Sequence, residues 1–269
     1  MGNAVKLFLA QKFLASMFFS VIAAVTFSGC VTQTTVETKI VDQAGKTDAL
    51  YRSQIHTERA SEYYRLGRMP VALEAAKEAV AALPTHAPAY NMLGIVYTEL
   101  KQDDKAREAY EQALRYAPND SETLNNFGWF LCARGNPKQA MQYFETALKN
   151  PVYATPERAL YNMGVCARRS GDNVLAEQQL RDTLRRQPRF APAMYELADM
   201  QFSQGKFKDA EAMIARHNDI TQTPGVDALW LGVRIARVQN DKQAEASYVQ
   251  QLRRRFPDAT QTRMALEGR

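Results

Sequence analysis

Residues 90–118 read YNMLGIVYTELKQDDKAREAYEQALRYAP and contain the pattern that decides the fold. Gly94 and Ala106 are small, so two helices can approach closely where these residues meet. Larger side chains fill the wedge between the two helices, namely Tyr90, Leu93, Tyr97 and Tyr110. Pro118 ends the second helix, because proline cannot continue it. The stretch therefore predicts one helix-turn-helix unit.

The same pattern recurs along the chain and resembles the tetratricopeptide repeat (TPR), which has a period of about 34 residues. Matching small and large residues include Tyr63, Ala72 and Ala76; Gly128, Ala140 and Phe144; Gly164, Ala176 and Leu180; Ala198, Ala210 and Ile214; Gly232, Ala244 and Tyr248. A single repeat cannot bury its own apolar face, so neighbouring repeats must stack. The expected fold is all-α, a TPR solenoid of about six repeats that forms a right-handed superhelix. An ordinary helical bundle with chance spacing is the alternative.

The expected repeats span about residues 53–86, 87–120, 121–156, 157–190, 191–224 and 225–258. The connection around Pro151 and Pro156 is about two residues longer than the repeat requires. Residues 259–269 are expected to form a C-terminal tail.

The N-terminus has the features of an export signal. Lys6 and Lys12 precede an apolar run over 13–25 that is short for a membrane span. The run ends in Phe27-Ser28-Gly29-Cys30, which resembles a bacterial lipobox. That resemblance implies a lipoprotein signal peptide over residues 1–29 and covalent lipid on Cys30. A secretory signal with an incidental cysteine and a membrane-spanning anchor are the alternatives.

Residues 30–52 are expected to be a lipidated, flexible tether, because they are polar and have no sustained apolar period. Several acyl chains on Cys30 would anchor the chain stably, at about 0.8 kcal/mol per buried CH₂. The next residue is Val31 rather than Asp. By resemblance to Gram-negative lipoproteins, this implies transport to the outer membrane.

The charge of the chain excludes nucleic acid as the expected partner. The formal net charge is +5. Loss of Lys6 and Lys12 with the signal peptide would leave 32 basic against 29 acidic residues, a net charge of +3. Such a weak excess does not indicate a phosphate-binding surface.

Cys132 and Cys166 remain when Cys30 is assigned to lipid. They occupy similar positions in the first helices of two successive repeats, and those helices pack side by side. An exported protein meets an oxidising environment, so a disulfide between them is expected. Two buried free thiols are the alternative.

The sequence offers no catalytic constellation. His56, His86 and His217 are scattered, without metal-ligand spacing or an accompanying acidic cluster. No nucleophile elbow or zinc-protease motif occurs. The chain is therefore expected to be a binding scaffold, with no enzyme activity, no small-molecule substrate, and no cofactor or metal besides the lipid.

A protein partner is expected to dock in a groove lined by the first helix of each repeat, where exposed aromatic side chains tend to mark interaction sites. The predicted groove residues are Tyr64, Asn91, Ile95, Asn125, Trp129, Tyr161, Val165, Arg168, Arg169, Tyr195 and Phe202, with Asp199, Leu229, Val233 and Arg237 completing the last two repeats. Trp129 and Tyr161 are the strongest single candidates.

The lipobox, the polar tether and six repeats together resemble the PilF/PilW family of type IV pilus biogenesis lipoproteins. Asn125 to Cys132 and Tyr161 to Cys166 are the most family-like segments. The resemblance implies a pilotin at the periplasmic face of the outer membrane. Such a protein binds the secretin of the pilus machinery, promotes its localisation and multimerisation, and thereby supports twitching motility. An envelope scaffold of another pathway, such as a peptidoglycan-hydrolase adaptor or an outer-membrane assembly lipoprotein, is the alternative.

Overall fold

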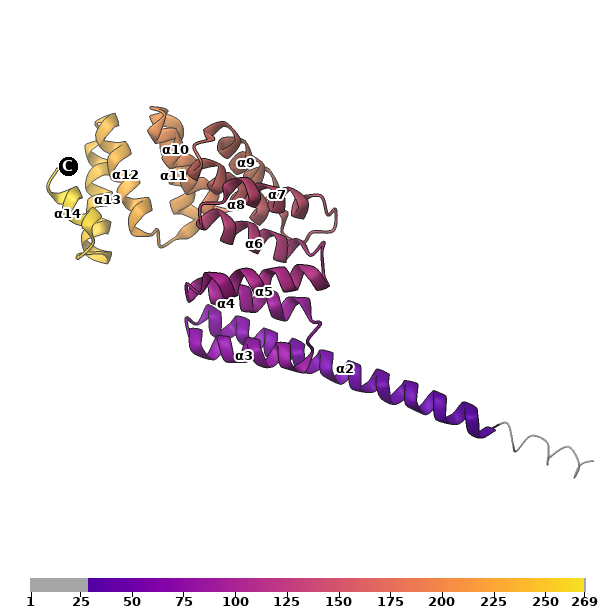
Figure 1. The fold of residues 1–269 in the computed structure, drawn as a ribbon. Coiled ribbons are helices and arrows are strands. Elements are labelled where there is room, and N and C mark those ends of the chain that lie inside the picture. Colours follow the sequence, from indigo (N-terminus) through magenta and orange to yellow (C-terminus); the bar gives the residue numbers. More distant parts are fainter. Residues whose placement is uncertain (1–28, 269) are drawn as a thin grey trace, which may run out of the picture. The chain divides into compact units, whose positions relative to one another are not determined.

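The structure, a computed structural model, describes residues 29–268, so the expected signal peptide before Gly29 lies outside the described residues. The described part consists of helices joined by short turns and contains no strand (Figure 1). The helices are α2 (Gly29–Arg65), α3 (Met69–Ala82), α4 (Ala87–Glu99), α5 (Asp103–Tyr116), α6 (Ser121–Ala133), α7 (Pro137–Leu148), α8 (Pro156–Arg169), α9 (Asn173–Arg186), α10 (Ala191–Ser203), α11 (Phe207–Thr221), α12 (Val226–Gln239), α13 (Lys242–Arg255) and α14 (Thr260–Leu266).

Helices α2 to α13 form six consecutive hairpins, which confirms the predicted repeat architecture. The turn inside each hairpin contains one residue with positive φ, as a tight reversal requires. It is glycine in four hairpins, and Lys101 and Asn240 take this conformation in the second and sixth. The chain divides into two compact units, the first ending at Ala89 and the second beginning at Tyr90.

In the first unit, α2 packs on α3 through small residues. Ala60, Ala72 and Ala76 are all fully buried. The Ser53 hydroxyl donates to the backbone oxygen of Ala79 at 2.7 Å and lies 2.7 Å from His86 Nδ1. These contacts hold the C-terminal half of α2 as the first helix of the first repeat.

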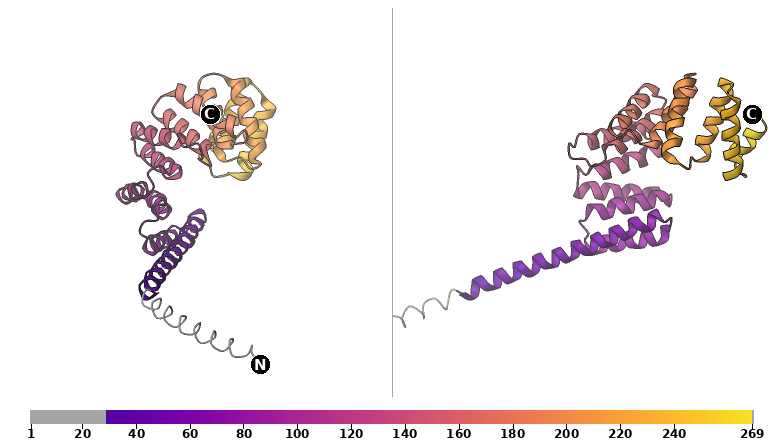
Figure 2. Two further views of the ribbon diagram at one scale, coloured as in Figure 1. Left: turned by 90° about the vertical axis from the view of Figure 1, so that its right-hand side faces the viewer. Right: turned by 180° about the vertical axis from the view of Figure 1, so that it is seen from behind.

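The flexible tether expected over residues 30–52 is replaced by helix, because α2 runs without a break from Gly29 to Arg65. Figure 2 shows its N-terminal part extending beyond α3. This stretch contains no proline, and Gly45 is the single glycine between Val31 and Arg65. Once a helix is nucleated, adding residues to it is far easier than starting a new one. The packed half of α2 therefore propagates toward Cys30.

The expected C-terminal tail also differs from the structure, because it contains α14. Thr262 and Ala265 of this helix are buried, and Ala265 packs with Leu229, Val233 and Leu252. The Thr262 hydroxyl donates to the backbone oxygen of Phe256 at 2.6 Å. The last repeat would otherwise expose the apolar side of α12, and α14 covers it.

The longer connection predicted between the third and fourth repeats joins Leu148 at the end of α7 to Pro156 at the start of α8. Tyr153 of this connection is buried, and its ring packs with Leu124, Ala147 and Ala159. The extra residues thus supply an aromatic side chain to the core between two repeats.

Within the hairpins of the second unit, a small residue of the first helix meets a large residue of the second, 16 positions later. A Cβ added to Gly94 would lie 2.6 Å from the ring of Tyr110. The equivalent distances are 2.8 Å from Gly128 to Phe144, 3.0 Å from Gly164 to Leu180 and 2.7 Å from Gly232 to Tyr248. The fifth repeat has Ala198 at this position and the smaller Ile214 opposite, both in one core cluster.

Gly94→Ala is expected to lower the free energy of unfolding by about 1–3 kcal/mol, because the new methyl group overlaps the buried Tyr110 ring. This loss exceeds the gain of at most about 1 kcal/mol in helix propensity. Thermal unfolding followed by circular dichroism measures the change. Gly45→Ala is the matched control, since it is also helical and its Cβ would meet nothing within 4 Å. Equal melting temperatures for the two variants would contradict the packing argument.

Candidate functional site

The first helices of the second unit (α4, α6, α8, α10 and α12) carry a set of partly exposed side chains that we call the A-face. It comprises Asn91, Ile95, Asn126, Trp129, Tyr161, Asn162, Arg168, Arg169, Tyr195, Glu196, Asp199, Phe202 and Arg234. The aromatic members pack one side against the core clusters and keep the other exposed. Tyr64, also predicted to line the groove, is half-buried on α2 in the first unit.

Asn125 and Val165 are buried, and their assignment to an open groove is wrong. Asn125 has no exposed surface and Val165 is 6% exposed. The Asn125 carboxamide oxygen accepts a hydrogen bond from Asn162 Nδ2 at 2.9 Å. Asn125 on α6 therefore faces the neighbouring helix α8 instead of an open groove.

Leu229 and Val233 are fully buried as well, so their predicted place in the groove is also wrong. The chain after Asp258 was expected to be a tail, whereas α14 packs on this part of α12.

Asparagine side chains connect successive first helices. Asn126 donates from Nδ2 to Asn91 Oδ1 at 3.2 Å, which joins α6 to α4. Asn162 joins α8 to α6 through Asn125, and Asn125 Nδ2 is buried without a hydrogen-bond partner. The repeat positions did not predict Asn126 and Asn162 as site residues. Both lie in the two segments that most resemble the PilF/PilW family, and this resemblance could have identified them as candidates.

Trp129 and Arg169 contact each other between α6 and α8. The Arg169 guanidinium carbon lies 4.8 Å from the centre of the Trp129 ring, a cation–π arrangement. Tyr161 packs against Phe190, with ring centres 5.3 Å apart. Burial raises the pKa of Tyr161 to about 12, and Glu196 acts in the same direction while Arg169 opposes it. The Tyr161 hydroxyl is therefore neutral at physiological pH and able to donate.

An ion-pair network joins α8, α10 and α12. Arg168 binds Glu196 at 2.6 Å and also binds Asp199. Arg234 reaches Asp199 at 3.7 Å and lies over the Phe202 ring at 4.3 Å. Burial disfavours the charged form of Arg168, but hydrogen bonds to the two carboxylates outweigh it and raise its pKa. The network fixes the relative positions of three first helices on the A-face.

Arg168→Gln is expected to lower the free energy of unfolding by about 1–2 kcal/mol, because Glu196 and Asp199 are partly buried and would lose their shared cation. Urea unfolding of the protein measures the change. Arg181→Gln is the matched control. It breaks a more exposed pair with Glu177 within α9 and should cost about 0.5 kcal/mol or less. Equal losses for the two variants would contradict the network's role.

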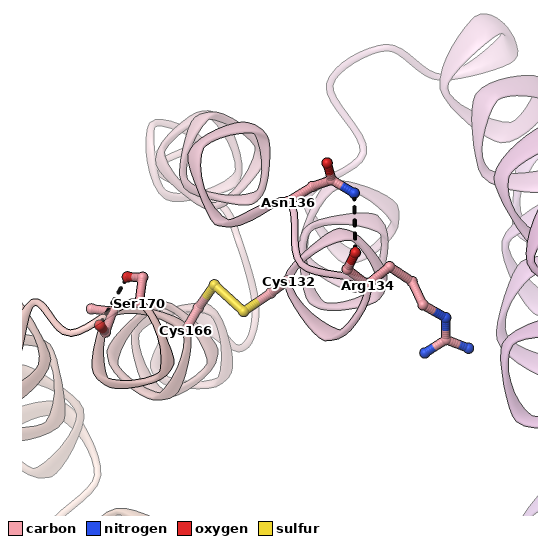
Figure 3. Close-up of a disulfide and its surroundings, with 6 residues drawn as sticks. Cys132, Arg134, Asn136, Cys166 and Ser170 are labelled. Atoms are coloured by element: carbon pink, nitrogen blue, oxygen red, sulfur yellow. Dashed lines mark hydrogen bonds between the residues drawn. A yellow bond between two sulfur atoms is a disulfide. The ribbon is translucent and has the colours of Figure 1, made fainter.

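Cys132 and Cys166, the pair predicted from the sequence, are joined by a disulfide (Figure 3). Their Cα atoms are 5.9 Å apart, and the bridge links α6 to α8 near the C-terminal ends of both helices. Trp129 lies three residues before Cys132, and Arg169 lies three residues after Cys166. The disulfide therefore holds together the two helices that carry the Trp129–Arg169 contact.

Cys132→Ala combined with Cys166→Ala is expected to lower the free energy of unfolding by about 3–4 kcal/mol, because the crosslink closes a loop of 34 residues. Denaturant unfolding of the oxidised and doubly substituted chains measures the difference. Adding a reductant to the unsubstituted chain should reproduce the loss and leave the double variant unchanged. A double variant as stable as the oxidised chain would contradict the expectation.

Residues 29–268 contain no group of three or more His, Cys, Asp and Glu side chains placed to hold a metal ion. In the same part of the chain, no helix has both the length and the apolar character needed to cross a membrane. The chemistry of the A-face is that of recognition: aromatic surfaces, amides and arginines.

Comparison with known proteins gives consistent matches over most of the chain. Two tetratricopeptide repeat families match, one over residues 87–150 and the other over residues 130–181 and 167–223. The type IV pilus assembly protein PilF of Pseudomonas aeruginosa is 25% identical over 236 residues, which cover 87% of this chain and 91% of that protein. A Hsp70-Hsp90 organizing protein of Triticum aestivum is 34% identical, but over 73 residues and 13% of its length.

Two solved structures resemble the chain over nearly their full length. The crystal structure of PilW, a widely conserved type IV pilus biogenesis factor, superposes with a TM-score of 0.73 at 35% identity. That match covers 80% of this chain and 98% of PilW. The structure of PilF from Pseudomonas aeruginosa gives a TM-score of 0.71 at 23% identity and covers 81% of this chain and 98% of that one, so it supports the fold.

Proposed function

The chain belongs to the PilF/PilW family of TPR proteins of type IV pilus biogenesis, and from this premise we propose that it is a pilotin. In this proposal it is a non-catalytic lipoprotein at the periplasmic face of the outer membrane. It binds the secretin of the pilus machinery and promotes secretin localisation and multimerisation, on which twitching motility depends.

The observation that carries the proposal is the 35% identity to PilW over 98% of that protein, combined with the chemistry of the A-face. Trp129, Tyr161, Tyr195 and Phe202 present partly exposed aromatic surface along one set of helices. Aromatic and arginine side chains are enriched at the centres of protein–protein interfaces. A folded or extended segment of a secretin subunit is the partner that this surface would take.

Delivery to the membrane rests on Cys30 in the proposal. Cys30 and Ser53 lie 23 positions apart in one helix, a separation of about 35 Å at 1.5 Å per residue. Lipid on Cys30 would attach the chain to the membrane, and α2 would set the distance from the anchor to the first repeat. A secretin subunit held by the repeats would then be carried to the membrane in which it assembles.

The proposal is tested by affinity capture from gently solubilised outer membranes, with the unsubstituted chain and with Cys30→Ala. We expect both forms to bind secretin, because the A-face is unchanged. We expect secretin multimers in the outer-membrane fraction to fall about tenfold or more with Cys30→Ala, because the lipid that anchors the complex is lost. Thr32→Ala is the matched control and should behave as the unsubstituted chain.

Two results would count against this function. Capture of peptidoglycan hydrolases or outer-membrane assembly proteins without secretin would favour a scaffold of another envelope pathway. Normal secretin multimers in the outer membrane with Cys30→Ala would refute the lipid-driven delivery.

A further inference from the structure

Arg169 differs from the other arginines on the first helices of the second unit. These helices carry five arginines, three on α8 and two on α12. Four of them have an acidic partner: Arg158 pairs with Glu122, Arg168 with Glu196 and Asp199, Arg234 with Asp199, and Arg237 with Glu245. Arg169 is exposed and takes part in none of the ion pairs found among the residues that the structure describes; its contact is with the Trp129 ring. Its positive charge is thus uncompensated on the A-face.

The contact with Trp129 holds this charge in place. The guanidinium lies 4.8 Å from the ring centre, so the ring restrains a side chain that would otherwise sample many rotamers. A guanidinium that contacts an aromatic face can still donate N–H groups from its edge to a carboxylate in a bidentate arrangement. The disulfide between α6 and α8 fixes the two helices on which this contact depends.

Amides lie on the same two helices. Asn162 precedes Arg169 by seven residues, or about two turns, so both side chains project from the same side of α8. Asn126 precedes Trp129 by three residues on α6. Each of these asparagines is partly exposed and uses one amide donor on a neighbouring asparagine. The remaining donor and oxygen of each amide match the N–H and C=O groups of a peptide backbone.

The spacing of these groups sets a register for a bound segment. Seven residues of α8 correspond to about 10 Å, and an extended peptide advances about 3.3 Å per residue. A peptide whose backbone contacts Asn162 therefore brings a side chain about three residues away to Arg169. A negatively charged side chain at that position would complement the uncompensated guanidinium.

We propose that the seam between α6 and α8, formed by Asn126, Trp129, Asn162 and Arg169, binds an extended segment of the partner protein through an Asp or Glu side chain on Arg169. This inference rests on the proposed function, in which the partner is the secretin. The asparagine amides form hydrogen bonds with the backbone of the segment, and Arg169 binds the carboxylate. The Trp129 ring contacts the guanidinium and restrains its position.

The first test is affinity capture of secretin by the full-length lipoprotein in detergent. Arg169→Gln is expected to weaken capture about tenfold, because one charge-assisted hydrogen-bonding group is lost. Arg169→Lys should bind with intermediate strength, since it keeps the charge but loses the planar fork. Arg186→Gln on α9 is the matched control, an exposed arginine away from the A-face that should bind as the unsubstituted chain. Unchanged melting temperatures would show that the variants are folded.

The second test locates the acidic residue. Short overlapping peptides of the captured secretin are titrated against the chain carrying Trp230→Phe, which leaves Trp129 as the remaining tryptophan reporter. Replacing Asp or Glu in a binding peptide by Asn or Gln should weaken it about tenfold, and Arg169→Gln should cause no further loss with that peptide.

The outcomes separate this inference from the pilotin proposal. Secretin captured equally by Arg169→Gln and by the unsubstituted chain would overturn the inference and leave the pilotin proposal standing. Loss of binding when the peptide C-terminus is amidated, with no effect of internal Asp and Glu, would also overturn it in favour of a terminal carboxylate. Failure of every form to capture secretin would overturn the pilotin proposal and this inference with it.

Discussion

The small space between two facing residues, 16 positions apart on the two helices of a hairpin, is the constraint on which the hairpins depend. In four hairpins a glycine admits the side chains of Tyr110, Phe144, Leu180 and Tyr248. The fifth hairpin has Ala198, and the opposing residue shrinks to Ile214. In the first hairpin both positions are alanine, Ala60 and Ala76, and both are fully buried. The sum of the two volumes is thus limited at each crossing, because helix cores are close-packed. This limit sets how closely the two helices of each hairpin approach.

This constraint is local, and for that reason the sequence predicts most of the fold. The residues of each crossing belong to the same repeat, so their spacing is visible without knowledge of the neighbours. The disulfide joins two repeats, and it was predictable because Cys132 and Cys166 hold similar positions in successive first helices. The two differences lie at the ends of the array. The part of α2 that precedes Ser53 is an extension of a packed helix. Helix α14 forms because α12 would otherwise expose Leu229 and Val233. Neither effect leaves a periodic signal.

The candidate site was predicted less completely than the fold, because its geometry depends on pairs from different repeats. Asn125 and Asn126 are adjacent in the sequence, yet Asn125 is buried against α8 and Asn126 is partly exposed. The sequence also gives no means of assigning partners to the arginines. Arg168 and Arg169 are adjacent, but one is held by Glu196 and Asp199 and the other contacts Trp129. The difference arises from the neighbours that α10 and α6 supply.

Helix α2 connects Cys30 to the first repeat as a continuous helix, and this has a geometric consequence for any anchor at Cys30. In a flexible coil, an inserted or deleted residue would not change the orientation of the first repeat in a defined way. In a helix, each inserted or deleted residue rotates the first repeat by about 100° around the helix axis and shifts it by about 1.5 Å along that axis. The number of residues between Cys30 and Ser53 therefore determines the rotational position of the first repeat around the axis of α2, relative to Cys30. Length changes of seven or eleven residues nearly preserve that rotational position, because they are close to whole turns. In such a chain the segment before the repeats has a phase as well as a length.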